Sequence, residues 1–239
     1  MYVFRADGAG VSGRKSGPGG HECTDDGGRP TGYVPVRASG RRPGVASGGV
    51  TFDVHPATLD RFDDVAAVIG PRRPDASVCF CLSHRLDTRT NRSMLGPARA
   101  EFVRGLCARD VSPGVLAYDG DVVVGWAAVA PRSELPYARS RTIPHVDDLP
   151  VWSVWCFRVR PGHRGRGVVH ALLGGAYDFA VGHGAPAVEG YPVDNAGEKV
   201  DLTMAYVGTR AVFEAAGFRV AAPTTSVVGG FPRVVMRRS

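Results

Sequence analysis

A chain of 239 residues with 44% hydrophobic residues is long enough for one domain with a real core and a tail. The net charge of +6 is spread along the chain, so an anionic ligand explains it as well as nucleic acid does. The five cysteines are too few, and odd in number, for a secreted disulfide scaffold. No apolar run matches a membrane span or a signal core, and we expect a reduced, cytoplasmic protein.

Residues 1–49 differ in composition from the rest of the chain. They hold 13 of the 32 glycines, and their apolar residues follow neither a strand nor a helix period. Such a segment cannot bury enough surface to offset its ordering entropy. We expect 1–49 to be a disordered Gly-rich extension and 50–239 to be the folded domain.

From residue 50 on, hydrophobic periodicity and turn residues predict the elements in chain order. A strand, two helices and a hairpin turned by Asp119-Gly120 come first: 50–54, 56–69, 97–109, and 114–118 with 122–130. A Pro-rich loop follows, and then strand, helix, strand, helix and two strands: 151–159, 166–182, 187–193, 209–216, 218–221 and 231–236. This order predicts a mixed α/β domain with a mostly antiparallel sheet and flanking helices, not a doubly wound fold.

The run Arg164-Gly165-Arg166-Gly167-Val168-Val169 joins the 151–159 strand to the helix after it. Two glycines let a ligand approach the backbone, and a helix N-terminus presents free N–H groups with positive polarity. Together they predict a phosphate or pyrophosphate seat. A Rossmann loop needs glycine where His170 stands, and a nucleotide P-loop needs Gly-Lys-Ser/Thr. The third interpretation is a loop for the coenzyme A pyrophosphate.

The segment Gly162-His163-Arg164-Gly165-Arg166-Gly167 resembles the Gln/Arg-x-x-Gly-x-Gly/Ala signature of the GNAT superfamily of acyl-CoA-dependent N-acetyltransferases. Residues 213–218, Phe-Glu-Ala-Ala-Gly-Phe, are similar to the family's closing Tyr-Glu-x-x-Gly-Phe. The resemblance spans roughly 50–239 and implies a GNAT-like fold. It implies acetyl-CoA as co-substrate, no metal, and direct acetyl transfer to an amine in a ternary complex. We expect a small-molecule acceptor, no nucleic-acid or membrane partner, and leave a homodimer open.

By the same resemblance, the backbone of Phe157 and Val159 pairs with the pantetheine arm of the cofactor. The backbone N–H groups of 164–169 hold the pyrophosphate, and the side chains of Arg164 and Arg166 add positive charge. The six residues are Arg164, Gly165, Arg166, Gly167, Val168 and Val169. The alternative is that the two glycines only make a tight strand-to-helix turn.

Three residues are candidates for proton transfer. Phe213 stands where many family members carry a tyrosine that protonates the departing thiolate, and phenylalanine cannot do so. Tyr191 and Tyr206 are the nearest replacements, with packing at a strand end as the alternative. Glu189 is a candidate base, directly or through water, with an ordinary solvent-facing strand residue as the alternative. The missing tyrosine also motivates a second hypothesis, a non-catalytic sensor that binds acyl-CoA.

The remaining polar and cysteine candidates are weaker. Glu134 and Asp194 are expected to be loop surface residues. Cys79 and Cys81 lack the further ligands that a structural zinc needs, so we expect packing or pocket lining. Cys156 is expected to be a buried free thiol rather than an acyl carrier. The calculated pI of 9.3 leaves nucleic-acid binding as a third, lower-ranked hypothesis.

Overall fold

The computed structural model describes residues 51–73, 75–76, 78–201 and 205–239. The expected 1–49 extension and the first residue of the expected 50–54 strand lie outside these residues. The described residues all fall within one compact unit. The division of the chain at 49/50 remains our proposal.

Seven strands form one sheet in the order β1-β2-β3-β4-β5-β7-β6. Every neighbouring pair is antiparallel except β4 and β5. The predicted mixed, mostly antiparallel α/β class is therefore confirmed. The strands are β1 Asp53–Pro56, β2 Gly114–Asp119, β3 Val122–Pro131, β4 Trp152–Val159, β5 Val188–Gly190, β6 Arg219–Val228 and β7 Phe231–Arg238.

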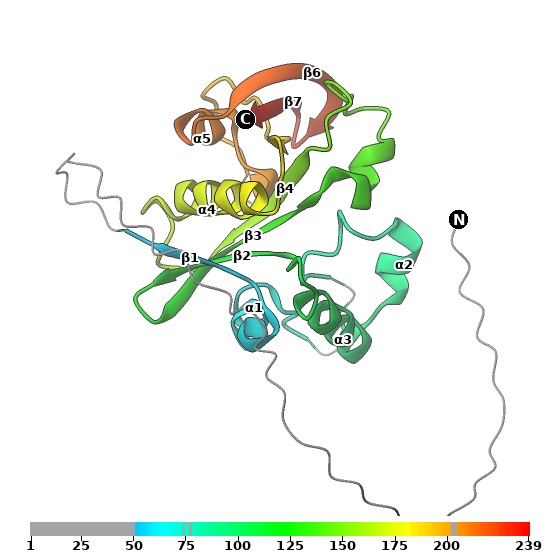
Figure 1. Cartoon of the computed structure of the whole chain (residues 1–239), viewed down its shortest axis with the longest axis vertical. Coiled ribbons are helices and arrows are strands. Elements are labelled where there is room, and N and C mark those ends of the chain that lie inside the picture. Colours follow the sequence, from blue (N-terminus) through cyan, green and yellow to red (C-terminus); the bar gives the residue numbers. More distant parts are fainter. Residues whose placement is uncertain (1–50, 74, 77, 202–204) are drawn as a thin grey trace, which may run out of the picture. The chain divides into compact units, whose positions relative to one another are not determined.

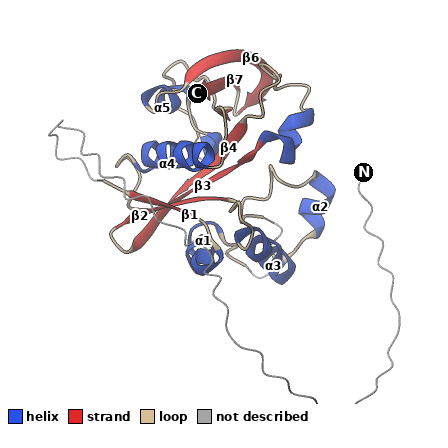
Figure 2. Cartoon of the chain, in the orientation of Figure 1, coloured by secondary structure: helices blue, strands red, loops and turns tan. Residues whose placement is uncertain are grey.

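Helices cover both faces of the sheet (Figures 1 and 2). On one face lies α4, Val168–Gly182, whose buried residues recur at helical spacing and pack on β2 to β4. On the other face lie α1, Phe62–Ile69, and α3, Gly96–Cys107. The shorter helices are α2 Thr88–Ser93, α5 Arg210–Ala215, and the 3₁₀ turns η1 Leu59–Arg61, η2 Arg132–Glu134, η3 Pro136–Arg139 and η4 Ala205–Val207.

Most predicted elements are present, with differences at four places. The first strand is 53–56 rather than 50–54, because those residues pair with β2. A short helix, α2, occupies part of the stretch expected to be irregular, and Asp87 caps it through the Thr90 N–H at 3.0 Å. The strand β5 ends at Gly190, and β6 continues to Val228 because it forms a long hairpin with β7.

The buried face of α3 also differs from the expected one. It consists of Arg99, Val103 and Cys107, whereas Phe102 and Leu106 are only partly buried. Arg99 is tolerated inside because its guanidinium donates to carbonyl oxygens of the 79–94 segment. From sequence alone, a charged residue in a helix is expected to be exposed. Arg99 instead anchors the helix to the 79–94 segment.

The strands β4 and β5 diverge after a short contact, and this divergence positions the site. They pair only over 152–154 and 188–190. The next residue bridge on the β5 side is made by Val193, which pairs with Thr209 and Arg233 instead. In β4, Cys156 has a φ of +52° at a register shift against β3, which marks a β-bulge. The β4 edge beyond Val154 therefore has no β5 partner.

Candidate functional site

The glycine loop between β4 and α4 is open on its ligand side. Gly162, Gly165 and Gly167 all have left-handed φ values of +87°, +73° and +89°. A Cβ built on any of them would have no described heavy atom within 4 Å outside its chain neighbours. No hydrogen bond among the described residues uses a backbone N–H of 164–169. These amides, at the N-terminus of a fifteen-residue helix, are placed where an anion could accept their hydrogen bonds.

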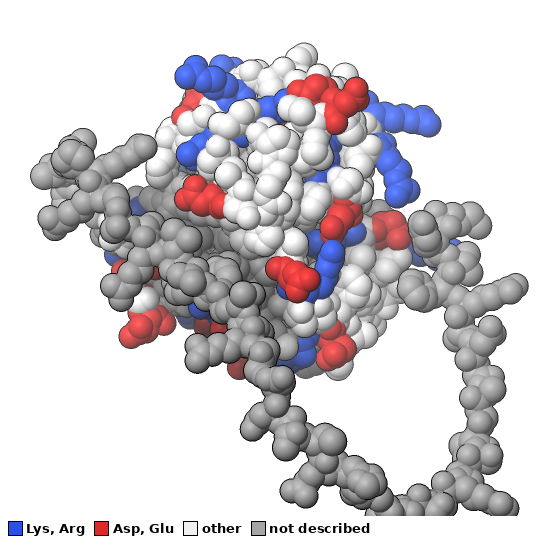
Figure 3. Space-filling model, viewed as in Figure 1, with Lys and Arg blue, Asp and Glu red and all other residues white. Residues whose placement is uncertain are grey.

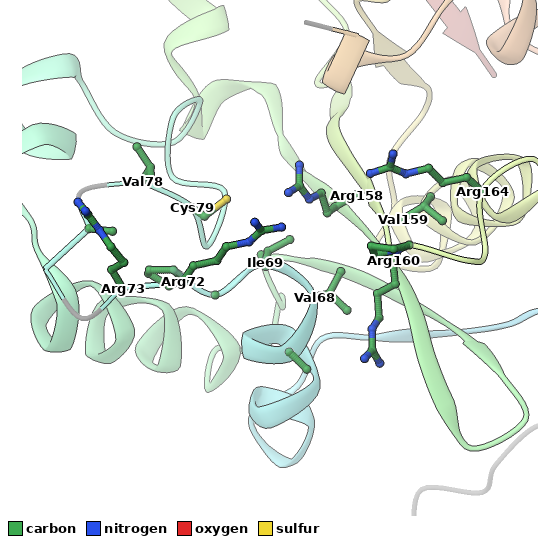
Figure 4. Close-up of a pocket in the computed structure, with 15 residues that line it drawn as sticks. Val68, Ile69, Arg72, Arg73, Val78, Cys79, Arg158, Val159, Arg160 and Arg164 are labelled. Atoms are coloured by element: carbon green, nitrogen blue, oxygen red, sulfur yellow. The ribbon is translucent and has the colours of Figure 1, made fainter. Parts of the chain in front are cut away.

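A pocket of about 480 Å³ lies beside this loop, between the end of α1 with the segment after it and the end of β4. Its apolar wall includes Val68 and Val159. In Figure 4, Arg72 and Arg158 point toward each other across it, and Arg164 extends toward Arg158. None of these three arginines has an ion pair with an acidic side chain of the described residues. The pocket therefore favours an anionic group.

Two other arginines near the loop are already engaged. Arg160 points away from the pocket in Figure 4 and donates to the Val123 carbonyl at 3.1 Å. Arg166 pairs with Asp119 at 2.9 Å and contacts the His163 ring nitrogen at 3.1 Å. Arg166 thus ties the loop to the end of β2, whereas Arg164 is the loop arginine that faces the pocket.

The predicted pantetheine residues lie on the β4 edge that β5 leaves unpaired. Phe157 is buried, and its ring meets Phe213 edge-on at 5.8 Å. Val159 is half-buried and lines the pocket. Phe213 is itself fully buried, and a Cβ at Gly190 would lie 2.0 Å from its ring. The residue that replaces the family's tyrosine is therefore a packing residue.

Glu189 is fully buried in an ion network that the sequence did not reveal. One carboxylate oxygen accepts from Arg132 at 2.8 Å and from the Tyr191 hydroxyl at 3.1 Å. The other accepts from Arg237 at 2.8 Å, and Arg237 also pairs with Asp147. Both carboxylate oxygens are engaged by these partners, so neither is placed to take a proton from a substrate amine. The alternative of a solvent-facing strand residue is wrong, because the side chain has 0% exposure.

The two candidate tyrosines occupy different environments. Tyr191 is buried, and its hydroxyl contacts Ser153 at 2.8 Å and Glu189. Burial, followed by the Glu189 charge, raises its pKa. Tyr206 is half-buried in η4, which lies against β4, and its hydroxyl is 3.2 Å from His84 Nε2. Only Tyr206 pairs with a second titratable side chain outside the Glu189 network.

His84 was missed by sequence reasoning because it stands 122 residues from its partner Tyr206. Its ring stacks between Tyr137 and Tyr206, with centroid distances of 5.3 and 5.5 Å. Burial, and then the charge of Arg233, lower its pKa to about 4, so the imidazole is neutral at pH 7. No local pattern in the sequence pointed to this histidine.

The cysteines correct one prediction. Cys156 is joined to Cys81 in a disulfide and is not a free thiol. The bond connects the segment before His84 to the bulge of β4. This pairing is at odds with the expectation of a fully reduced chain. Cys79 lines the pocket that holds Arg72 and Arg158, which agrees with the expectation of packing or pocket lining.

The weaker candidates, Glu134 and Asp194, both lie at the surface of the domain. Glu134 pairs with Arg109 and Asp194 with Arg210, both as surface ion pairs. Among the described residues no group of three His, Cys, Asp or Glu side chains could hold a metal. Nor does any helix in that part of the chain have the length and apolarity to cross a membrane. On the face in Figure 3, basic and acidic side chains of the described residues are interspersed rather than gathered into a basic stripe.

A mixed sheet with two diverging central strands and an open amide loop is an arrangement that suits a phosphorylated cofactor. The model of the acetyltransferase (GNAT) family matches residues 84–196, which run from the segment before α2 to the residues after β5. Residues 84–196, a little under half of the chain, are thus similar to the GNAT family of acetyltransferases.

Similar solved structures include a GCN5-related N-acetyltransferase from Kribbella flavida. It is 17% identical with a TM-score of 0.43, over 72% of this chain and 34% of that chain. This chain thus matches about a third of that protein's length. A GNAT acetyltransferase from Bacillus cereus is 14% identical, with a TM-score of 0.44, over 79% and 97%. The yncA protein of Salmonella typhimurium, with its cofactor acetyl-CoA, is 18% identical, with a TM-score of 0.40, over 79% and 93%. No curated protein matches the sequence.

Proposed function

We propose that this protein transfers an acetyl group from acetyl-CoA to the amine of a small molecule, by direct transfer in a ternary complex. One observation carries the proposal: the backbone N–H groups of 164–169 have no acceptor among the described residues and stand at a helix N-terminus. A tight turn alone would not require these amides to stay unpaired. The pyrophosphate of acetyl-CoA supplies the missing acceptors, and the family match agrees with it.

The residues around the loop fit such a cofactor. Arg72, Arg158 and Arg164 would neutralise its phosphate groups, because they line one pocket and lack acidic partners among the described residues. The unpaired β4 edge at Phe157 and Val159 would accept the amide-bearing pantetheine arm as a further strand does. When bound, acetyl-CoA supplies a thioester carbonyl that an amine can attack.

Side chains of the protein would donate protons and hold the reacting groups in position around that carbonyl. We propose that the Tyr206 hydroxyl donates a proton to the departing thiolate, since η4, which carries Tyr206, lies against β4 and the hydroxyl contacts His84. The proton that the attacking amine loses would restore the hydroxyl. His84 is a positioning residue, because its ring stacks on Tyr206 and its nitrogen bonds the hydroxyl. Glu189 and Tyr191 hold β5 and the η2–η3 segment in place. Much of the acceleration comes from placing two reactants together.

A titration of acetyl-CoA by isothermal calorimetry tests the cofactor assignment. Gly167→Leu should abolish binding, because the new side chain occupies the face on which the diphosphate lies. Gly184→Leu is the matched control: Gly184 also has a left-handed φ, +81°, and open space around it, but follows the far end of α4. Both variants lose about 1–2 kcal/mol of stability from backbone strain. Equal affinities of the two variants would contradict the assignment.

The second hypothesis, a non-catalytic acyl-CoA sensor, rests on Phe213. That residue has a packing role in this structure, so its identity leaves the proton-transfer question to Tyr206. Incubation with acetyl-CoA and a broad amine panel separates the two functions. Release of free coenzyme A thiol that depends on an amine supports the transferase. Tight binding of acetyl-CoA, with no release of coenzyme A in the presence of any amine, supports the sensor.

A further inference from the structure

Five side chains form a cluster where β5 ends and leaves β4. We call His84, Tyr137, Tyr191, Tyr206 and Arg233 the Tyr137 cluster. Tyr137 lies at its centre, with its ring 4.7 Å from Tyr191 and 5.3 Å from His84. The Arg233 guanidinium is 5.9 Å from the centre of the Tyr191 ring. The cluster brings together η3, η4, β7, the end of β5 and the segment before α2.

Several buried donors in and beside this cluster have no acceptor. The Tyr137 hydroxyl, Arg233 Nη2 and the indole N–H of Trp155 are buried without a hydrogen-bond partner in the structure. The Tyr137 ring also meets Trp155 edge-on at 6.4 Å. Buried donors in folded proteins are nearly always satisfied. The Tyr137 hydroxyl and the two further donors beside it, on Arg233 and Trp155, therefore favour an acceptor group that comes from outside the chain.

The local charge is also unbalanced. Arg233 is 6% exposed, and its one hydrogen bond goes from Nε to the Tyr191 carbonyl at 2.7 Å. No acidic side chain of the described residues lies within 4.0 Å of it. Glu189, the buried acid nearby, is already shared by Arg132 and Arg237. A buried guanidinium without a counter-ion is unfavourable, so an incoming anion would be stabilised here.

We propose that the Tyr137 cluster binds a carboxylate of the amine acceptor, through Arg233, the Tyr137 hydroxyl and the Trp155 indole. This inference rests on the proposed function, since it names the acceptor class of the same enzyme. A carboxylate carries one negative charge and accepts several hydrogen bonds, which matches one guanidinium and two neutral donors. The acceptor is thus an amino acid or another amine with an acid group, not a neutral amine.

A binding experiment on the full chain tests this without turnover. The probes are propionate and benzoate, each compared with its neutral amide at equal ionic strength, with thermal unfolding as the readout. We expect the carboxylates to raise Tm and the amides to leave it unchanged. Arg233→Gln and Tyr137→Phe should weaken carboxylate binding about tenfold or more. Because Tyr137→Phe keeps the aromatic ring, it still tests the inference if Arg233→Gln fails to fold. Arg139→Gln, an exposed arginine of the same 3₁₀ turn, is the charge-matched control and should behave as wild type.

Kinetics with acetyl-CoA give the second readout. Matched pairs such as phenylalanine with its amide, and β-alanine with its amide, should show kcat/KM about ten- to hundredfold higher for the acid. Arg233→Gln should remove that preference. Equal turnover of acids and amides, or stabilisation by inorganic phosphate but not by carboxylates, overturns the inference. Failure of wild-type protein to bind acetyl-CoA overturns the proposed function, whereas intact cofactor binding without a carboxylate effect overturns only this inference.

Discussion

Replacing Glu189 with glutamine separates its two possible roles. Gln keeps the shape of the side chain but removes the charge that faces Arg132 and Arg237. Arg237 retains Asp147, whereas Arg132 keeps only backbone carbonyl acceptors and loses its acid partner. Removal of one member of a buried ion pair costs about 3–5 kcal/mol, because the remaining charge stays buried. For a domain of this size that corresponds to a Tm decrease of about 6–20 °C.

The assay is urea unfolding of Glu189→Gln beside Glu134→Gln. Glu134 also pairs with an arginine, at 3.3 Å, but both side chains are well exposed. The surface variant should lose no more than about 1 kcal/mol. We expect the buried variant to be strongly destabilised, with kcat of the folded enzyme within about tenfold of wild type, because the network holds the site and does not touch the reacting atoms.

The opposite pattern would refute this reasoning. A general base typically contributes 10²- to 10⁴-fold to the rate. If Glu189→Gln lowered kcat by about that factor and left the unfolding free energy unchanged, the carboxylate would be a base after all. Arg132 and Arg237 would then serve to hold the catalytic carboxylate in position. The assignment of proton transfer to Tyr206 would be wrong.

Three further predictions concern stability. The pKa of His84 is about 4 in the folded protein and near 6.5 in the unfolded chain, so the unfolded state binds more protons between these pH values. The unfolding free energy of wild type should therefore fall by about 3 kcal/mol as pH drops from 6.5 to 4. In pH-dependent urea unfolding, His84→Phe should lose less than wild type over the same range. Cys156→Ser opens a disulfide that spans 75 residues and should cost about 4 kcal/mol, and wild type should show two more thiols after reduction than before in a thiol titration. Gly190→Ala places a methyl group 2.0 Å from the Phe213 ring and should cost about 3 kcal/mol or prevent folding, whereas Gly174→Ala, with open space on α4, should stabilise by up to about 1 kcal/mol; equal effects in calorimetry would contradict the packing.

Local sequence patterns were sufficient for most of the elements and for the position of the glycine loop before α4. The Asp119-Gly120 turn, the apolar stripe of α4 and the glycines before it each depend on neighbouring residues, which a linear pattern records. The same holds for the mixed sheet, since the order of strands and helices limits the topologies. The errors fell where pairing partners decide the outcome, as in the length of β6 and the short β5.

The sequence by itself therefore determined the fold class and the place where a cofactor's phosphates are expected to lie. Only the tertiary structure decided what surrounds the reacting centre. It brought His84 to Tyr206, enclosed Glu189 between two arginines, and left Arg233 buried without a counter-ion. The physical reason is that burial and charge pairing arise between residues from distant segments. A carboxylate in a strand has the same local sequence whether it faces water or two guanidinium groups, and its chemistry depends on which one the fold supplies.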